Sequence, residues 1–235
     1  HVSRKEGETR RPKVPRNASE DFGRKEQIMI HSPFHVVEDF ISPQHCERLI
    51  SGLALKYPDI GENGQPLKYE RHIPADLAGG VLSELDALSP LIEQRFGAEV
   101  VGDPALLFQQ YWENPKSPAE GMRCENSEFK RKKWVKVKDV DLVGFLWLKT
   151  YHDAVPLDPR IECYGGKLEF PAYNFSLTPI AGTLVLFPAT PHFVTAMSHV
   201  MLGSLEQIKI GLKLKNWAYD PSNFPGSYKE WFFDV

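Results

Sequence analysis

The part of the chain that decides the fold contains GGKLEFP at residues 165–171 and GTLVLFP at residues 182–188. Both are short, mainly apolar runs that begin with glycine and end with proline, as strands between turns do. Residues 182–188 are almost continuously apolar, which predicts a strand that is buried on both faces. Residues 207–214, QIKIGLKL, alternate polar and apolar side chains, which predicts a strand with one solvent-facing side.

Three similar runs precede these strands: LLFQQYW at 106–112, GMRCEN at 121–126 and VGFLWLK at 143–149. The pattern of apolar runs therefore predicts a single β-structure over residues 108–215. Amphipathic patterns in regions 43–57 and 82–96 predict helices that pack on one of its sheets. Pro90 is expected to kink or split the second helix, because proline lacks the N–H that the helix needs. The predicted fold class is mainly β, of the α+β kind.

The order of these runs resembles the 2-oxoglutarate/Fe(II)-dependent oxygenases, and within them the prolyl 4-hydroxylase-like group, over residues 34–215. The features that carry the resemblance are Tyr111, Gly121, the apolar run 145–148, the strands at 165–171 and 182–188, His192 and Lys209. It implies a double-stranded β-helix, or jelly-roll, core backed by N-terminal helices. In an active member it also implies an HxD pair and a distal histidine that bind Fe(II). Tyr111 and Lys209 would then bind 2-oxoglutarate.

The HxD motif is degenerate, since the corresponding residues are Arg123, Cys124 and Glu125. Non-haem Fe(II) is held by two histidines and one carboxylate. A guanidinium is always protonated and has no lone pair to offer, so Arg123 cannot replace a ligand. We expect an internal ion pair between Arg123 and Glu125 where the metal would stand. The alternative is a different register, in which Arg123 is an ordinary strand residue.

Three residues compete for the position of the distal histidine. His192 ranks first because it directly follows the apolar strand, and His199 is its rival because it lies ten residues before Lys209. Thr195 is a third register and would leave no histidine at this position. An active enzyme would need Glu125, His192 and a third group such as His199 as ligands. With the degenerate motif we predict neither a metal nor a cofactor.

Composition suits one domain with a substantial core, since 42% of the 235 residues are hydrophobic. The net charge of -3 gives no general support for nucleic-acid binding. The three cysteines form no CxxC motif and are expected to be free thiols in a reducing compartment. No run is apolar enough to span a membrane, and no signal peptide is recognised. We therefore expect a cytoplasmic or virion location.

Three regions are expected along the chain: an extended polar and basic arm at 1–30, the oxygenase-like domain at 31–215 and an aromatic tail at 216–235. The arm is broken by prolines and cannot build a core alone. The tail contains many aromatic rings, and exposing so much apolar surface to water is unfavourable. The tail should therefore cover the β-core or anchor a neighbouring subunit. We assign both the arm and the tail to contacts with protein subunits, of an assembly or of a homo-oligomer.

The favoured function is a catalytically inactive oxygenase-fold protein used as a structural or assembly component. Tailed phages contain genes that this one resembles, which suggests a virion component. The alternative is an active hydroxylase that uses Fe(II) and 2-oxoglutarate on a peptide, nucleobase or small molecule. A third, weaker hypothesis is nucleic-acid binding by the cations at 130–133, within FKRKKWVKVK. We favour a solvated hairpin there, so a nucleic-acid partner is not expected.

Overall fold

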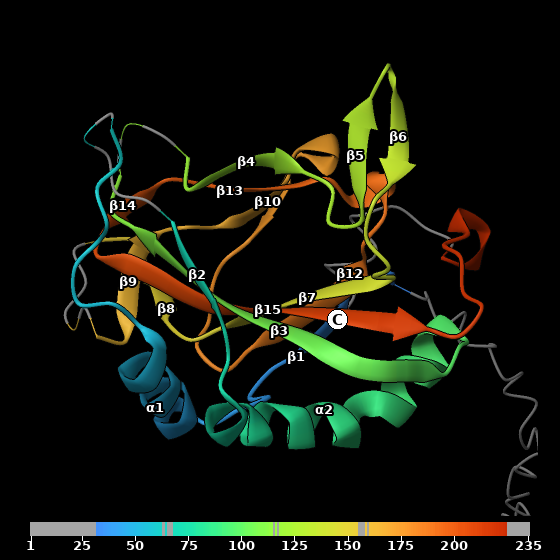
Figure 1. Cartoon of the computed structure of the whole chain (residues 1–235), viewed down its shortest axis with the longest axis horizontal. Helices are drawn as coiled ribbons and strands as arrows, with labels where there is room; N and C mark the ends of the chain where they lie inside the picture. The colour runs from blue at the N-terminus through green and yellow to red at the C-terminus, as the bar shows by residue number, and fades with distance from the viewer. Residues whose placement is uncertain are drawn as a thin grey trace, which may run out of the picture.

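The computed structural model describes residues 32–62, 64, 68–114, 116, 118–154, 158 and 160–224 (Figure 1). The predicted arm at 1–30 and the last part of the tail, 225–235, lie outside these residues. Two helices are described, α1 (Pro43–Leu53) and α2 (Ala75–Phe96), and the remaining regular structure is mainly strand. The prediction of a mainly β chain with helices near its N-terminal side is confirmed.

A six-stranded sheet forms the centre of the molecule, and all its neighbouring strands are antiparallel. Its strands, in spatial order, are β1 (His35–Val37), β12 (Leu184–Pro188), β7 (Leu142–Trp147), β15 (Ser204–Leu214), β3 (Val100–Trp112) and β2 (Tyr69–His72). Figure 1 shows α2 running along one face of this sheet, as predicted. Every residue of β7 and β12 is buried, which confirms the interpretation of GTLVLFP.

A second sheet covers the opposite face of the six-stranded sheet (Figure 1). It contains β11 (Phe175–Leu177), β10 (Leu168–Phe170), β13 (Thr195–Met197) and β4 (Glu120–Arg123). Smaller sheets are formed by β14 (Val200–Leu202), β9 (Glu162–Gly165) and β8 (Thr150–His152), and by β5 (Ser127–Lys130) and β6 (Lys133–Lys136). Three short 3-10 helices are η1 (Pro171–Tyr173), η2 (Pro191–Phe193) and η3 (Pro221–Asn223). Two packed sheets of this kind make the predicted β-sandwich core.

Local chemistry explains where the helices begin and end. The Ser42 side chain accepts a hydrogen bond from the His45 N–H and caps α1, which ends at Leu53 rather than continuing to residue 57. Helix α2 ends at Gly97, whose φ of 70° is the left-handed conformation that glycine adopts easily. No helix in the described residues is long and apolar enough to cross a membrane.

Helix α2 is continuous through Pro90, so the expectation of two short helices is wrong. An internal proline costs about 3 kcal/mol. Leu88 and Ile92, on either side of Pro90, are both buried. Burying two such side chains stabilises by about 1.5–3 kcal/mol each. Packing on the sheet therefore outweighs the lost helical hydrogen bond.

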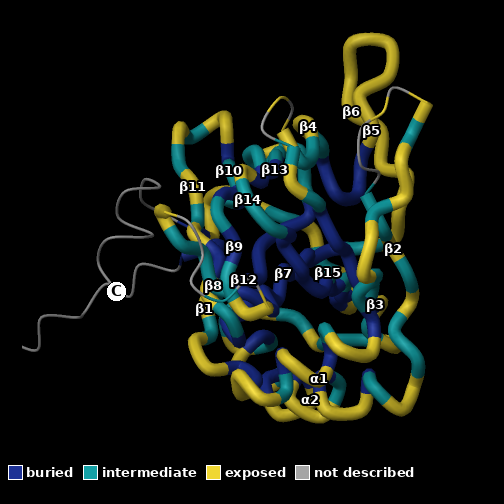
Figure 2. Tube along the Cα trace, turned by 90° about the vertical axis from the view of Figure 1, so that its left-hand side faces the viewer, coloured by how far each residue is buried: buried dark blue, intermediate teal, exposed yellow. Residues whose placement is uncertain are grey.

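The β5–β6 hairpin extends away from the sheets, and Figure 2 shows it almost entirely exposed. The solvated hairpin predicted for FKRKKWVKVK is therefore present. The first part of the aromatic tail covers its own domain, which is one of the two alternatives predicted for it. The Trp217 indole N–H donates to the Phe96 carbonyl at 3.0 Å, and Phe224 is buried. For residues 216–224, the rings thus pack on their own domain.

Candidate functional site

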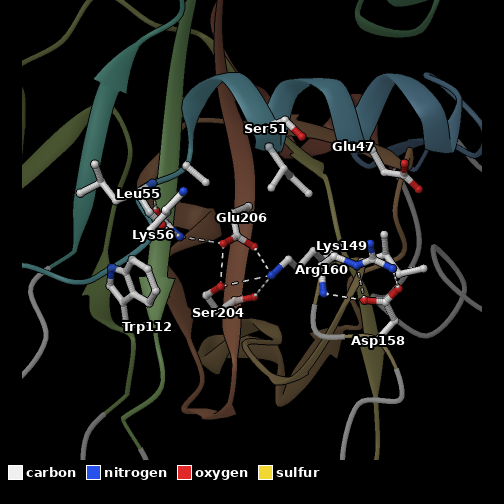
Figure 3. A pocket seen from close by; sticks show the side chains of 14 residues that line it. Glu47, Ser51, Leu55, Lys56, Trp112, Lys149, Asp158, Arg160, Ser204 and Glu206 are labelled. Atoms are coloured by element: carbon white, nitrogen blue, oxygen red, sulfur yellow. Dashed lines mark hydrogen bonds and ion pairs between the residues drawn. The ribbon is translucent and has the colours of Figure 1, made fainter.

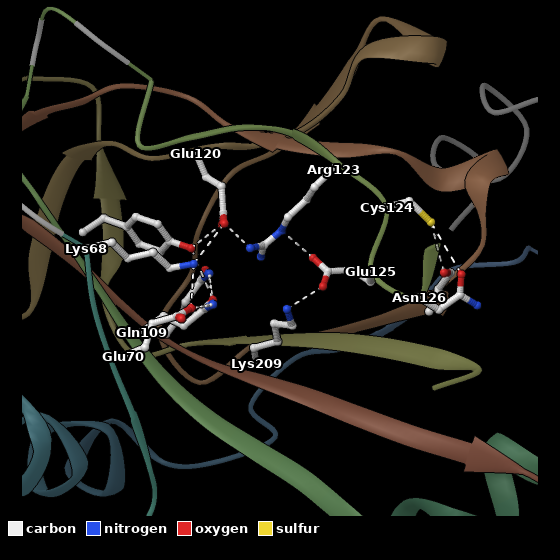
Figure 4. A network of polar contacts seen from close by, with 12 residues as sticks. Lys68, Glu70, Gln109, Glu120, Arg123, Cys124, Glu125, Asn126 and Lys209 are labelled. Atoms are coloured by element: carbon white, nitrogen blue, oxygen red, sulfur yellow. Dashed lines mark hydrogen bonds and ion pairs between the residues drawn. The ribbon is translucent and has the colours of Figure 1, made fainter. Parts of the chain in front are cut away.

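The degenerate motif lies where the two sheets face each other. Strand β4 ends at Arg123, and Glu125 follows two residues later, before β5 begins. Arg123 Nε lies 2.7 Å from Glu125 Oε1, so the predicted ion pair is present. The second oxygen, Glu125 Oε2, lies 2.5 Å from Lys209 Nζ on β15 (Figure 4). One carboxylate from the second sheet is thus held between two cations, one from each sheet.

A further group of polar residues continues this cluster toward β2. Arg123 also contacts Glu120 on its own strand, and Lys68 Nζ lies 3.0 Å from Glu120 Oε1. The Tyr111 hydroxyl donates to Glu120 Oε2 at 2.6 Å. Lys68 in turn pairs with Glu70 at 2.6 Å (Figure 4). The space between the sheets therefore contains a connected ionic network at this end.

Sequence reasoning missed Glu120, Lys68 and Glu70. Glu120 lies three residues before Arg123, and a regular strand would place their side chains on opposite faces. The register of β13 against β4 shifts between Thr195 and Met197, which records a local irregularity beside these residues. Glu70 lies on β2, far away in the sequence from Glu120, and no local pattern indicates that the two join one network.

Electrostatics in the cluster favour the ionised carboxylate. Burial alone would raise the pKa of Glu125, whose side chain is only 2% exposed, but the charges of Arg123 and Lys209 outweigh burial and lower it. Burial would lower the pKa of Arg123, and the neighbouring Glu125 raises it. The pKa of Lys209 is lowered by burial, in spite of Glu125. Glu125 is therefore ionised, because its two cationic neighbours act on it in the same direction.

The structure places the three candidates for the distal position in different surroundings. The residue opposite Arg123 across the β4–β13 pair is Thr195. His192 lies in η2, is exposed, and its ring centre is 5.0 Å from that of Tyr219. The backbone oxygen of His199 accepts from Gly166 N at 2.8 Å, beyond the end of β13. Of the three candidates, Thr195 is the one that pairs directly with Arg123, and the rank of His192 for the distal position stays a prediction.

Fe(II) does not fit the residues at this site. Arg123 offers no lone pair, and the hydroxyl of Thr195 is not one of the histidine or carboxylate ligands that Fe(II) takes. Glu125 is the remaining carboxylate, and both its oxygens are engaged by cations. Across the described residues, no three His, Cys, Asp or Glu side chains are grouped so that they could hold a metal ion.

The two residues assigned to 2-oxoglutarate are also engaged within the chain. Lys209 pairs with Glu125, so its charge is not directed at an external carboxylate. The Tyr111 hydroxyl bonds to Glu120, and burial followed by the Glu120 charge raises its pKa well above the usual value. The structure brings Tyr111, Arg123, Glu125 and Lys209 to one end of the space between the sheets, but as partners of other protein groups.

A cavity of about 470 Å³ lies on the other face of the six-stranded sheet, between α1 and strands β3 and β15 (Figure 3). Its floor contains a buried ion pair, Lys149 Nζ to Glu206 Oε2 at 2.8 Å. Gln110 Nε2 donates to Glu206 at 2.8 Å, and the Ser204 hydroxyl at 2.6 Å. Burial raises the pKa of Glu206, although Lys149 opposes the shift. These polar groups satisfy one another, which indicates a role in holding the strands together.

Neither a protein-family model nor a curated protein sequence matches the chain. Solved structures do match. The viral collagen prolyl hydroxylase of Paramecium bursaria Chlorella virus 1, in its complex with 2-oxoglutarate, has a TM-score of 0.54 and 12% identity, over 77% of this chain and 96% of that chain. A prolyl 4-hydroxylase of Pseudomonas putida has a TM-score of 0.53 and 16% identity, over 79% and 94%.

A third match is a prolyl hydroxylase of Trichoplax adhaerens, solved with a fragment of the hypoxia inducible factor oxygen degradation domain. Its TM-score is 0.51 and its identity 10%, over 77% of this chain and 84% of that chain. Identities this low speak for the fold alone, and the matches extend over most of each domain. The chain therefore has the double-stranded β-helix fold of the prolyl 4-hydroxylase-like oxygenases.

Proposed function

We propose that this chain is a non-catalytic protein on an oxygenase fold, used as a structural or assembly component. The observation that carries the proposal is the cluster of Arg123, Glu125 and Lys209. By the resemblance, Arg123 and Glu125 stand where an active member has its HxD pair, and the cluster contains one carboxylate and two cations. Fold alone does not determine function, so the proposal depends on these side chains.

Binding of Fe(II) here would be unfavourable for two separate reasons. The metal would have to displace both cations from a carboxylate that is almost fully buried. Arg123 would then have lost Glu125 and, among the described residues, would keep only Glu120, while its positive charge repelled the divalent cation. Ion pairs between the sheets instead connect β4 to β15, which suits a role in stability.

The proposed assembly role depends on surfaces other than the cluster of Arg123, Glu125 and Lys209. Residues 1–30 are basic, interrupted by two prolines and low in apolar side chains, a composition that cannot build a core by itself. The β5–β6 hairpin carries apolar and cationic side chains into solvent. A tailed-phage virion is the assembly that the sequence resemblance suggests.

Turnover of 2-oxoglutarate tests this proposal. The purified chain would be incubated with Fe(II), ascorbate, oxygen and 2-oxoglutarate, and succinate would be measured, with the Pseudomonas putida prolyl 4-hydroxylase as the positive control. We expect succinate at the level of a blank without protein. Iron-dependent succinate above that level would contradict the proposal and support the active hydroxylase instead.

A further inference from the structure

The β5–β6 hairpin has apolar side chains in water on both of its faces. Phe129 and Trp134 are partners across the strands, with ring centres 5.3 Å apart, and they are 62% and 39% exposed. Val135 pairs with Glu128 and lies on the other face, where it is also exposed. An isolated two-stranded hairpin is only marginally stable in water. Such a ribbon would gain from a surface that covers it.

Charge is concentrated in the same element. Residues 127–138 contain six cations and one carboxylate, a net charge of +5, so the rest of the chain carries a net charge of -8. Among the described residues, no carboxylate lies within ion-pair distance of Arg131, Lys132 or Lys133 at the tip. The hairpin is therefore a basic element on an acidic body.

The backbone conformation at the tip of the hairpin is one that arginine and lysine rarely adopt. Arg131 and Lys132 have φ angles of 50° and 65°. Two-residue turns with both φ angles positive usually contain Asn-Gly or a similar pair, because other side chains are strained there. Strain of this kind persists mostly at functional positions. The two cations thus occupy a turn for which less strained residues were available.

A complementary surface lies at the opposite end of the molecule. Residues 75–94, almost all of α2, contain four carboxylates and neither lysine nor arginine. Arg95, the basic residue of the last turn, faces inward and donates to the carbonyls of residues 32 and 34. Three of the carboxylates are exposed: Asp76, Glu84 and Asp86. Leu91 on this helix is 53% exposed. Figures 1 and 2 both place α2 and the hairpin at opposite ends of the fold.

We propose that the β5–β6 hairpin of one molecule docks on the outer face of α2 of a second copy of this chain. The contact joins a basic tip and an apolar ring pair to an acidic helix with an exposed leucine. Because it joins two different surfaces, it is heterologous and builds a chain or a closed ring of copies. It names a contact for the assembly role proposed above and rests on that role.

Nucleic acid fits the hairpin less well. The Phe129 and Trp134 rings pack edge to face against each other at 62°, whereas bases stack on free ring faces. The net charge of -8 on the rest of the chain would also repel a long polyanion. A second copy of the chain instead presents an acidic helix, α2, to the basic hairpin.

Charge reversal with exchange tests the contact. Sedimentation velocity would be run on the full chain over a range of concentrations, at low and raised salt. The tip variant is Arg131→Glu with Lys132→Glu, and the helix variant is Glu84→Lys with Asp86→Lys. The matched control reverses two exposed cations elsewhere, Lys56→Glu with Lys116→Glu. We expect the wild type and the control to associate, and each test variant to associate about tenfold more weakly or not at all.

The decisive experiment is to mix the two test variants. The reversed tip of one then meets the reversed helix of the other, and the native tip meets the native helix, so association should return. A wild type that stays monomeric at every concentration and salt level, or a mixture that remains monomeric, overturns the proposal. So does binding of a single-stranded oligonucleotide by the hairpin without self-association. The succinate assay is independent of these results, so failure of the docking leaves the non-catalytic assignment to be judged separately.

Discussion

Arg123 and Thr195 face each other across strands β4 and β13. One residue is a permanent cation and the other a buried hydroxyl. The charge of Arg123 is then balanced by Glu125, the third residue of the degenerate motif, at 2.7 Å. Glu125 is almost fully buried, and its negative charge is balanced by two cations, Arg123 and Lys209.

Removing the guanidinium should destabilise the fold. Arg123→Met leaves Glu125 buried with Lys209 as its one remaining partner among the described residues, and we expect the free energy of unfolding to fall by about 2–4 kcal/mol. Urea denaturation would measure the change. Arg160→Met is the matched control, since Arg160 also pairs with a carboxylate, that of Asp158, but is 86% exposed at its side chain, and it should leave stability unchanged. Equal effects of the two substitutions would mean that the buried pair contributes no more to the free energy of unfolding than the exposed pair does.

Acid should remove the contribution of Glu125. Its pKa is lowered in the folded chain, so the unfolded chain binds the proton more tightly, and the stabilisation is present above the unfolded pKa and lost as the pH falls through the folded pKa. Compared with Glu125→Gln, the wild type should be more stable at about pH 7, and the difference should shrink toward about pH 3. Thermal unfolding of both proteins across this range checks the trend. A difference that does not change with pH would contradict the ionised state.

The buried ion pair between Lys149 and Glu206, near α1, should show a large interaction energy in a double-mutant cycle. Each single change, Lys149→Met or Glu206→Gln, breaks the buried ion pair between Lys149 and Glu206, so each should cost about 3–5 kcal/mol. The double variant has no buried charge, and the amide oxygen introduced by Glu206→Gln can still accept from Gln110 and Ser204, so it should cost clearly less than the two single changes together. A double-variant cycle by chemical denaturation measures this. Additive costs would show that the two side chains act separately.

Much of the fold could be predicted from the chain because β7 and β12 are continuous apolar runs with glycine and proline at their ends. The ion pair between Arg123 and Glu125 was also predictable, since it follows from the charge and spacing of two nearby residues. The alternation of β15 was recognised, but its polar side was assigned to water. Lys209 in fact points between the sheets, because a carboxylate from the other sheet is there to receive it.

The distal position could not be assigned from sequence, which offers three registers for it. His192 follows the apolar strand directly, and in the structure it lies in η2 with its ring close to that of Tyr219. The register of β13 depends on pairing with a strand that lies about seventy residues earlier in the chain, and a one-residue change of register exchanges the two faces. Glu120 and Lys68 were missed for the same reason, since long-range pairing brings them together.

Restoring the ligands should restore a metal site. A variant with Arg123→His, Glu125→Asp and Thr195→His supplies two imidazoles on facing strands and a shorter carboxylate, the set that Fe(II) takes in this fold. We expect it to bind Fe(II) stoichiometrically, measured by anaerobic calorimetry. The variant without Thr195→His should bind more weakly, because it lacks the third ligand. Equal binding by both would mean that position 195 does not face the metal.

The most direct measurement is an anaerobic titration of the unmodified chain with Fe(II) in the presence of 2-oxoglutarate, followed through the metal-to-ligand absorption band. If Arg123, Glu125 and Lys209 occupy the metal position, no band should develop and the iron should remain in free solution after gel filtration. Stoichiometric iron retained by the wild-type chain, with the band present, would contradict the central claim that this ionic cluster has replaced the metal.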